Sequence, residues 1–190
     1  DPRPININPN EGTVDIEYNV VEKPSDQIEL SGGFGNGRVI GTLGLTFNNF
    51  SARNLFNGKA WKPVPKGDGQ TLSVRAQTNG KMYHSYNVSF SEPWFGGKKP
   101  IYFGVNAYTS VQSNGLDSGD PSLQRIRMTG MSFSLGKQLK FPDDYFQTNT
   151  TLEFKQYNLR NYTGFLFSNG VAYNFNLTQA FTRNSLDSPI

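Results

Sequence analysis

Long runs in which apolar and polar side chains alternate are the feature that most limits how this chain can fold. In residues 71–79, Leu72 and Val74 fall on one side of the chain, and Ser73 and Arg75 fall on the other. A period of two predicts a β-strand with one apolar and one polar face. Similar runs, separated by turn signals, predict strands at 27–35, 38–48, 71–79, 83–92, 101–111, 125–139, 146–159 and 171–181. No amphipathic helix of ordinary length interrupts them, so the sequence predicts an all-β protein.

The length of these runs narrows the fold class further. About eight strands of 9–14 residues exceed the five or six residues usual in globular sheets. They match tilted strands that cross a bilayer. The polar face carries mainly Ser, Thr, Asn, Gln and Gly, which is too polar for a packed core. We therefore predict an antiparallel transmembrane β-barrel, with a soluble sandwich or lipocalin-like barrel as the alternative. The mean hydropathy of −0.54 agrees with this prediction, since barrel strands are only half apolar.

The alternation also assigns side chains to faces. Four residues are expected to contact lipid: Val74, Val88, Val105 and Phe175. Four are expected to face the lumen: Arg75, Asn87, Asn106 and Asn174. Rings near strand ends are expected to form interfacial girdles: Phe47, Tyr83, Phe90, Tyr108, Phe146 and Phe181. Trp94 and Phe95 are expected to anchor at the interface, or alternatively to dock a partner lipoprotein.

Composition argues against several function classes. The chain has no Cys, a single His and a net charge of +3, with scattered basic residues. Nucleic-acid binding, thiolate metal sites and thiol nucleophiles are therefore not expected. His84 has no second His or Cys to complete a metal site, and Glu153 with Lys155 is better interpreted as a lumenal pair than as catalytic groups. The glycine-rich run 32–37 precedes no helix that could present amide groups to a phosphate. We predict no enzyme activity, no metal and no cofactor.

The first strand of the series is weak at its far end. Ile28, Leu30 and Phe34 share a face, but glycines stand at 32, 33 and 35, which leaves few side chains to pack. Upstream, residues 1–12 carry three prolines and are expected to be irregular, and residues 13–23 alternate as a half-buried strand with an acidic polar face. We expect residues 1–24 to end a separate soluble domain and residues 27–190 to form barrel strands.

The order of these motifs resembles one family. A stalk strand at 14–20 leads into Gly32-Gly33-Phe34-Gly35, followed by Asn54-Leu55-Phe56-Asn57-Gly58 and by Ser89-Phe90-Ser91-Glu92-Pro93-Trp94-Phe95. This order resembles the BamA-type outer-membrane protein assembly factors of Gram-negative bacteria. The resemblance implies the end of the last periplasmic POTRA domain, followed by the N-terminal half of a sixteen-stranded barrel. Residues 182–189 resemble that family's connector after the eighth strand, and its lid loop would lie beyond Ile190. The connection 49–67 is longer than the short periplasmic turns of such barrels.

The resemblance also implies a function. The protein would fold and insert client barrels, with unfolded outer-membrane proteins, accessory lipoproteins and outer-membrane lipids as partners. Its first strand would be a lateral gate that pairs with client strands through the backbone: Gln27, Ile28, Glu29, Leu30, Ser31, Gly32, Gly33, Phe34 and Gly35. The alternative is an outer-membrane transport barrel, either a two-partner secretion translocator or a porin-like channel.

This interpretation fixes the expected topology. With residues before Gln27 in the periplasm, the loops 35–38, 79–81, 113–124 and 160–170 would face outside. The connections 49–67, 92–100 and 140–145 would face the periplasm.

Overall fold

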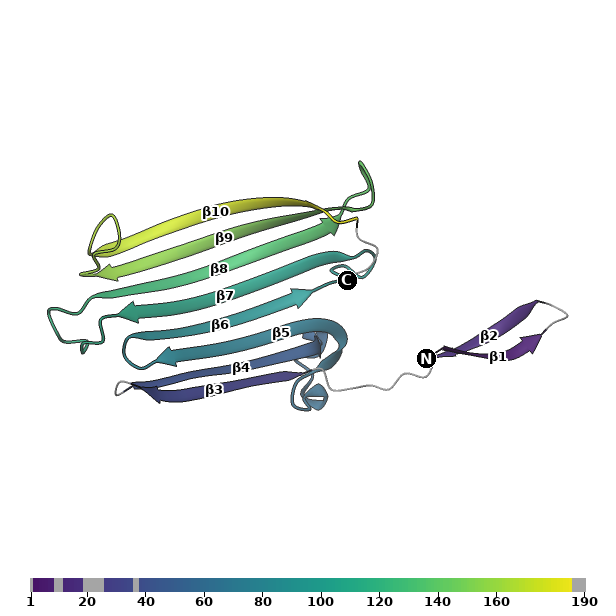
Figure 1. The fold of residues 1–190 in the computed structure, drawn as a ribbon, viewed down its shortest axis with the longest axis horizontal. Helices are drawn as coiled ribbons and strands as arrows, with labels where there is room; N and C mark the ends of the chain where they lie inside the picture. Colours follow the sequence, from purple (N-terminus) through teal and green to yellow (C-terminus); the bar gives the residue numbers. More distant parts are fainter. Residues whose placement is uncertain (1, 9–11, 19–25, 36–37, 186–190) are drawn as a thin grey trace.

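The computed structural model describes residues 2–8, 12–18, 26–35 and 38–185. Its main element is an eight-stranded antiparallel sheet in which each strand pairs with its sequence neighbour (Figure 1). The strands are β3 (Gln27–Gly35), β4 (Arg38–Phe50), β5 (Lys66–Asn79), β6 (Tyr83–Glu92), β7 (Ile101–Ser113), β8 (Arg125–Gln138), β9 (Phe146–Arg160) and β10 (Gly170–Arg183). Within the described residues, β3 and β10 form the two edges, and the sheet stays open.

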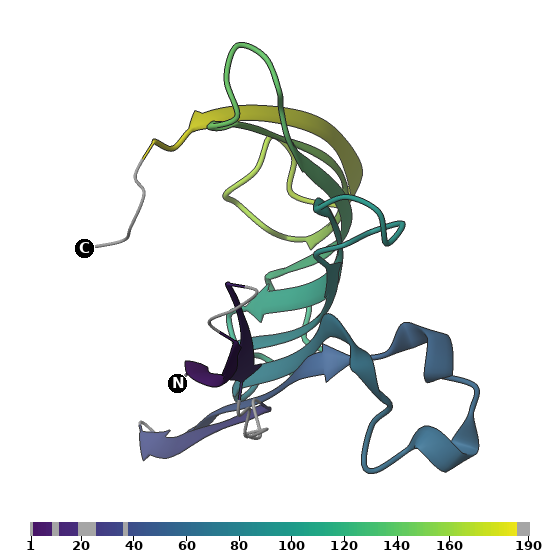
Figure 2. The same ribbon diagram turned by 90° about the vertical axis from the view of Figure 1, so that its right-hand side faces the viewer.

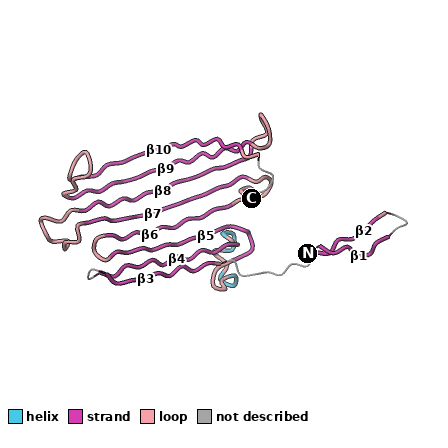
Figure 3. The backbone as a smooth tube through the Cα atoms, viewed as in Figure 1, coloured by secondary structure: helices cyan, strands magenta, loops and turns pink. Residues whose placement is uncertain are grey.

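All eight predicted strands are confirmed, and the all-β prediction with them. The main differences are at the β4–β5 connection. Here β4 continues through Asn49 and Phe50, and β5 begins at Lys66 rather than Thr71. Two short 3-10 turns, η1 (Ala52–Asn54) and η2 (Gly58–Ala60), are the helical elements of the described chain (Figure 3). No helix in this part of the chain has the length and hydropathy to cross a membrane.

The sheet is curved like part of a cylinder wall (Figure 2). Residues directly opposite one another form rows that run across all eight strands. One such row is apolar on every strand: Ile28, Leu45, Val74, Val88, Ala107, Met131, Phe154 and Phe175. The neighbouring row is mostly polar: Gln27, Thr46, Ser73, Ser89, Asn106, Ser132, Glu153 and Asn176. The register therefore separates an apolar from a polar face over the whole sheet.

Burial shows which face is which. On β8, burial alternates residue by residue, and the polar-face residues are the more covered ones. The side chain of Glu153 is 21% exposed, whereas residue Phe175 on the apolar face is 75% exposed. Side chains crowd together on the inside of a curved sheet and spread apart on its outside. The polar side is therefore the concave face and the apolar side is the convex face.

This arrangement is the reverse of a water-soluble fold. An extended apolar surface exposed over eight strands would be unfavourable in water. In a bilayer it is the expected outer wall of a barrel, and the polar face becomes the inner wall. The sheet is thus part of a transmembrane β-barrel that is not closed by the described residues.

Two of the residues expected to form girdles do not lie on the apolar face. Tyr108 and Tyr83 lie on the concave face, where their strand positions alternate with convex residues such as Ala107 and His84. The ring of Tyr108 lies over Gly130, where a Cβ would stand only 2.6 Å from the ring carbons. The glycine makes room for a ring inside the curve. Phe47, Phe90, Phe146 and Phe181 lie on the convex face.

The N-terminal segment is a hairpin of β1 (Pro2–Asn8) and β2 (Thr13–Tyr18). The expectation that residues 1–12 are irregular is therefore wrong for 2–8. Pro2 and Pro4 occupy alternate positions of β1. The residues between and after them still have backbone N–H groups that can pair with a neighbouring strand. β2 was predicted to be half-buried, but all six of its residues are exposed, because among the described residues β2 pairs with β1 alone. Part of the predicted strand, residues 19–23, lies outside the described residues.

Candidate functional site

The edge strand β3 is the predicted gate, and the structure places it as the first strand of the sheet. Within the described residues it pairs only with β4. Among the described residues, no strand pairs with its outer row of backbone N–H and C=O groups. Its apolar side chains gain little packing, as Leu30 is 80% exposed and Ile28 and Phe34 are similarly open. β3 is held in the sheet mainly by its backbone ladder with β4.

One ion pair reinforces that ladder on the concave face. The guanidinium of Arg75 on β5 donates to the carboxylate of Glu29 on β3. The two side chains meet across β4 at Gly44, where a Cβ would lie 3.3 Å from the Glu29 side chain. Both partners are about half exposed, so the pair contributes at most roughly 1 kcal/mol. The contact joins the edge strand directly to the third strand of the sheet.

A second pair of contacts fixes the start of β3. The carboxylate of Asp26 accepts a hydrogen bond from the backbone N–H of Asn48 at 3.2 Å. Its other oxygen contacts the Lys66 ammonium at 2.5 Å. Asp26 thereby ties the entrance of β3 to both β4 and β5.

At the other end of β3, the described residues show no comparable side-chain contact. Gly32 pairs with Gly41, and Gly33 pairs with Ile40, so side-chain contact across this part of the ladder is nearly absent. Glycine in a strand interior weakens it through backbone entropy and lost packing. The edge strand is therefore fastened at one end and weakly held at the other. The predicted turn residues 36–37 lie outside the described residues.

The sequence-predicted face residues are grouped as expected on the sheet. Val74, Val88 and Phe175 lie in one convex row, and Val105 lies in the next convex row with Phe90. Their contact with lipid stays a prediction. Arg75, Asn87, Asn106 and Asn174 all lie on the concave face, and the Asn87 amide donates to the Asn106 side-chain oxygen at 2.7 Å.

Two groups weighed as catalytic candidates have structural partners instead. Glu153 and Lys155 form a 2.8 Å ion pair with each other on the concave face. The His84 ring lies 6.2 Å from the ring of Tyr86. No cluster of three potential metal-ligating acids or histidines occurs among the described residues.

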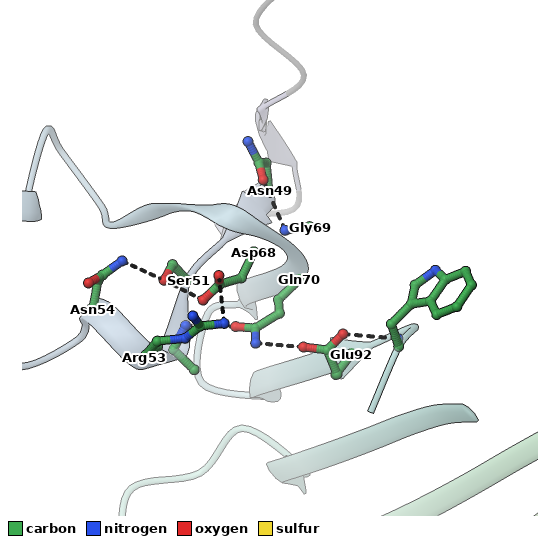
Figure 4. Close-up of polar contacts among 10 residues, drawn as sticks. Asn49, Ser51, Arg53, Asn54, Asp68, Gly69, Gln70 and Glu92 are labelled. Carbon is green, nitrogen blue, oxygen red and sulfur yellow. Dashed lines mark hydrogen bonds and ion pairs between the residues drawn. The ribbon is translucent and has the colours of Figure 1, made fainter. Parts of the chain in front are cut away.

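The long β4–β5 connection, residues 51–65, is held in place by hydrogen bonds and an ion pair at its base. We call this connection the hook. Ser51, at its start, is fully buried, and its hydroxyl donates to the Asp68 carboxylate at 2.6 Å (Figure 4). Asp68 also contacts the Arg53 guanidinium at 3.2 Å. The backbone N–H of Ser51 donates to the carbonyl of Pro65, which closes the base of the hook.

A glutamine links the hook to the next turn. The side-chain oxygen of Gln70 accepts from the backbone N–H of Ala52, and its amide donates to the Glu92 carboxylate, both at 2.6 Å (Figure 4). Glu92 in turn accepts from the backbone N–H of Trp94 at 2.9 Å. Sequence reasoning missed this network, because its hydrogen-bonded partners lie up to 22 positions apart and carry no local pattern. The unusual length of the connection was the one signal of it.

At the opposite end of the sheet, the loops bind one another. The Arg160 guanidinium donates to the carbonyls of Ser118 and Asp120 at 2.8 and 3.1 Å. Lys81 contacts Asp117 at 2.6 Å, and this hydrogen bond and charge lower the pKa of the exposed Asp117 carboxyl. The β7–β8 loop is thus fixed to both neighbouring turns.

Comparison with known families agrees with this architecture. The model of the Omp85 superfamily domain matches residues 66–190, which is more than half of the chain. The match begins at β5 and covers the remaining strands of the sheet. Comparison with curated proteins and with solved structures returned no match.

Proposed function

Since this chain belongs to the Omp85 superfamily, whose members act in outer-membrane protein insertion or transport, we propose that it is the central subunit of an outer-membrane β-barrel assembly machinery. In this proposal it folds and inserts client barrels, and β3 is the lateral gate. The described sheet would be the first half of a sixteen-stranded barrel. The hairpin β1–β2 would belong to the last periplasmic POTRA domain.

One feature carries the proposal: β3 combines an intact backbone with glycines at 32, 33 and 35, which provide no side chains for packing. An insertase has to open its barrel and offer that edge to a client. β3 contains no proline, so all its backbone donors and acceptors can pair with an incoming strand. Because backbone pairing does not read side chains, one gate can accept many clients.

The distribution of contacts suggests how the gate would open. Asp26 and Glu29 hold the first half of β3, while the glycine-rich second half shows no equivalent contact among the described residues. Pairing with the closing strand would therefore be lost first at the Gly32–Gly35 end. No nucleotide would be needed, because hydrogen bonding and burial of the client in the bilayer provide the driving force.

Transport is the alternative within the same superfamily. The polar concave face with Arg75, Asn87 and Asn106 would suit a water-filled lumen, so a two-partner secretion translocator or porin-like channel is the second candidate.

Depletion of the full-length protein in its host separates the two functions. Assembly function predicts that many unrelated outer-membrane barrels decline together, measured by quantitative proteomics of the outer membrane with transcript levels as the control. Loss of a single secreted substrate, with other barrels at normal levels, would favour transport and contradict the proposal.

A further inference from the structure

The hook combines a rigid base with an exposed apolar and basic tip. Its base is held by the contacts of Ser51, Asp68 and Gln70 described above. Its tip presents Phe56, which is 96% exposed, together with the exposed side chains of Leu55 and Trp61. The indole N–H of Trp61 donates to the carbonyl of Leu55 at 3.0 Å, which fixes the two residues relative to each other. An exposed aromatic side chain on a loop whose base is fixed by hydrogen bonds indicates a binding surface.

The hook lies on the convex side of the sheet (Figure 2). Phe50, just before it, is 4% exposed and packs edge-on against Phe90 of the convex face, with ring centroids 6.3 Å apart. The hook therefore continues the apolar wall that the fold assigns to lipid.

Its position along the strand matches the edge of the apolar band. On the convex side of β5, the apolar run of Leu72, Val74 and Ala76 is bounded by Gln70 and Thr78. At about 3.3 Å per residue and a tilt of about 40°, Gln70 and Thr78 are separated by roughly 20 Å across the membrane. The apolar band of such barrels is about 25 Å tall. Gln70, which holds the hook, thus stands at one boundary of the band.

The charge on the tip is positive and uncompensated. Lys59 and Lys62 are exposed, and no carboxylate of the described residues lies within ion-pair distance of either. The nearby acid of the hook base, Asp68, is already bonded to Arg53 and Ser51. Aromatic rings beside unpaired lysines suit the interface of a bilayer, where rings lie at headgroup level and ammonium groups meet phosphates.

We propose that the hook is a membrane anchor that inserts Phe56 and Trp61 into the headgroup region of one leaflet and binds phospholipid phosphates through Lys59 and Lys62. By the expected topology this is the periplasmic leaflet. Through Lys66 and Asp26, the hook is also linked to the start of β3, so it would hold the edge strand at a fixed depth. The proposal rests on the transmembrane sheet and does not depend on whether the protein inserts or transports its substrates.

The test uses the full-length protein in vesicles of phosphatidylethanolamine and phosphatidylglycerol. Phe56→Cys carries an environment-sensitive fluorophore, and Leu166→Cys is the matched control. Leu166 is 97% exposed but lies in the β9–β10 loop at the other end of the sheet. The expected result is a blue-shifted emission at position 56 that is quenched by nitroxides near the lipid headgroup, and a water-like, unquenched emission at position 166.

A second measurement addresses the charges. With the nitroxide on phosphatidylglycerol, Lys59→Gln and Lys62→Gln should each reduce the enrichment of this lipid at the probe by about fivefold. Water-like emission at position 56 in vesicles of folded protein would overturn the anchor. If position 56 is water-like in vesicles but shielded in native membranes, the surface would be assigned to a protein partner instead. Unchanged enrichment in both lysine variants would overturn the phosphate site.

Discussion

Replacing Val74 by arginine tests the assignment of the convex face to lipid. Val74 is the middle apolar residue of β5 on that face, with Leu45 and Val88 as its cross-strand neighbours. Since Gln70 and Thr78 bound the apolar run symmetrically, Val74 lies about 10 Å from each boundary. That places it near the middle of the bilayer, where a charged side chain has the largest effect.

The magnitude follows from this depth. An arginine at the midplane of a lipid-facing strand costs about 2–4 kcal/mol, which corresponds to roughly a 30- to 700-fold change in the folding equilibrium. The matched control is Asn106→Arg, on the concave face. That change removes one hydrogen bond from Asn87, so its cost should stay near 0.5–1.5 kcal/mol.

The assay is reversible folding of the full-length protein into phospholipid vesicles, followed by urea titration and by the heat-dependent gel shift of folded barrels. We expect a large loss of stability for Val74→Arg and a small one for Asn106→Arg. Equal losses for the two variants would mean that both faces are packed against protein. The transmembrane interpretation of the sheet would then be refuted.

Three further outcomes are expected. An impermeant thiol reagent should label Ser113→Cys but not Lys62→Cys in intact cells, and the opposite pattern would invert the topology. Glu29→Gln should speed hydrogen exchange along the edge strand, with a stability loss of at most roughly 1 kcal/mol; unchanged exchange would show that the ion pair does not hold the strand. The depressed pKa of Asp117 means that its contact with Lys81 is fully present above the ordinary pKa near 3.8 and is lost as the pH falls through the lower folded value. NMR titration should show this pKa rising towards its ordinary value in Lys81→Met, and no rise would contradict the contact.

The strands were predictable because their signal is local. The alternation in residues 71–79 or 101–111 can be read from consecutive residues. The turns between strands contain Asn, Gly and Pro. The division into two faces followed for the same reason, and the register kept Val74, Val88 and Phe175 in one row.

What could not be predicted depends on contacts between distant residues. Glu29 and Arg75 are 46 positions apart and meet only because Gly44 leaves space between them. The hook is held by Ser51 and Gln70, whose partners come from other strands. β1 was missed for a different reason, as prolines usually signal irregular structure, and here they occupy positions that an edge ladder tolerates.

The most direct test of the central claim is to trap a client on the gate. A cysteine replaces Ser31 in β3, and a second is placed in the C-terminal strand of a client barrel stalled during assembly. Thr78→Cys in β5 is the control, since β5 is paired on both sides. If β3 receives client strands, an inter-chain disulfide should form with Ser31→Cys and not with Thr78→Cys. A disulfide at the β5 position, with none on β3, would show that clients enter elsewhere and would contradict the gate.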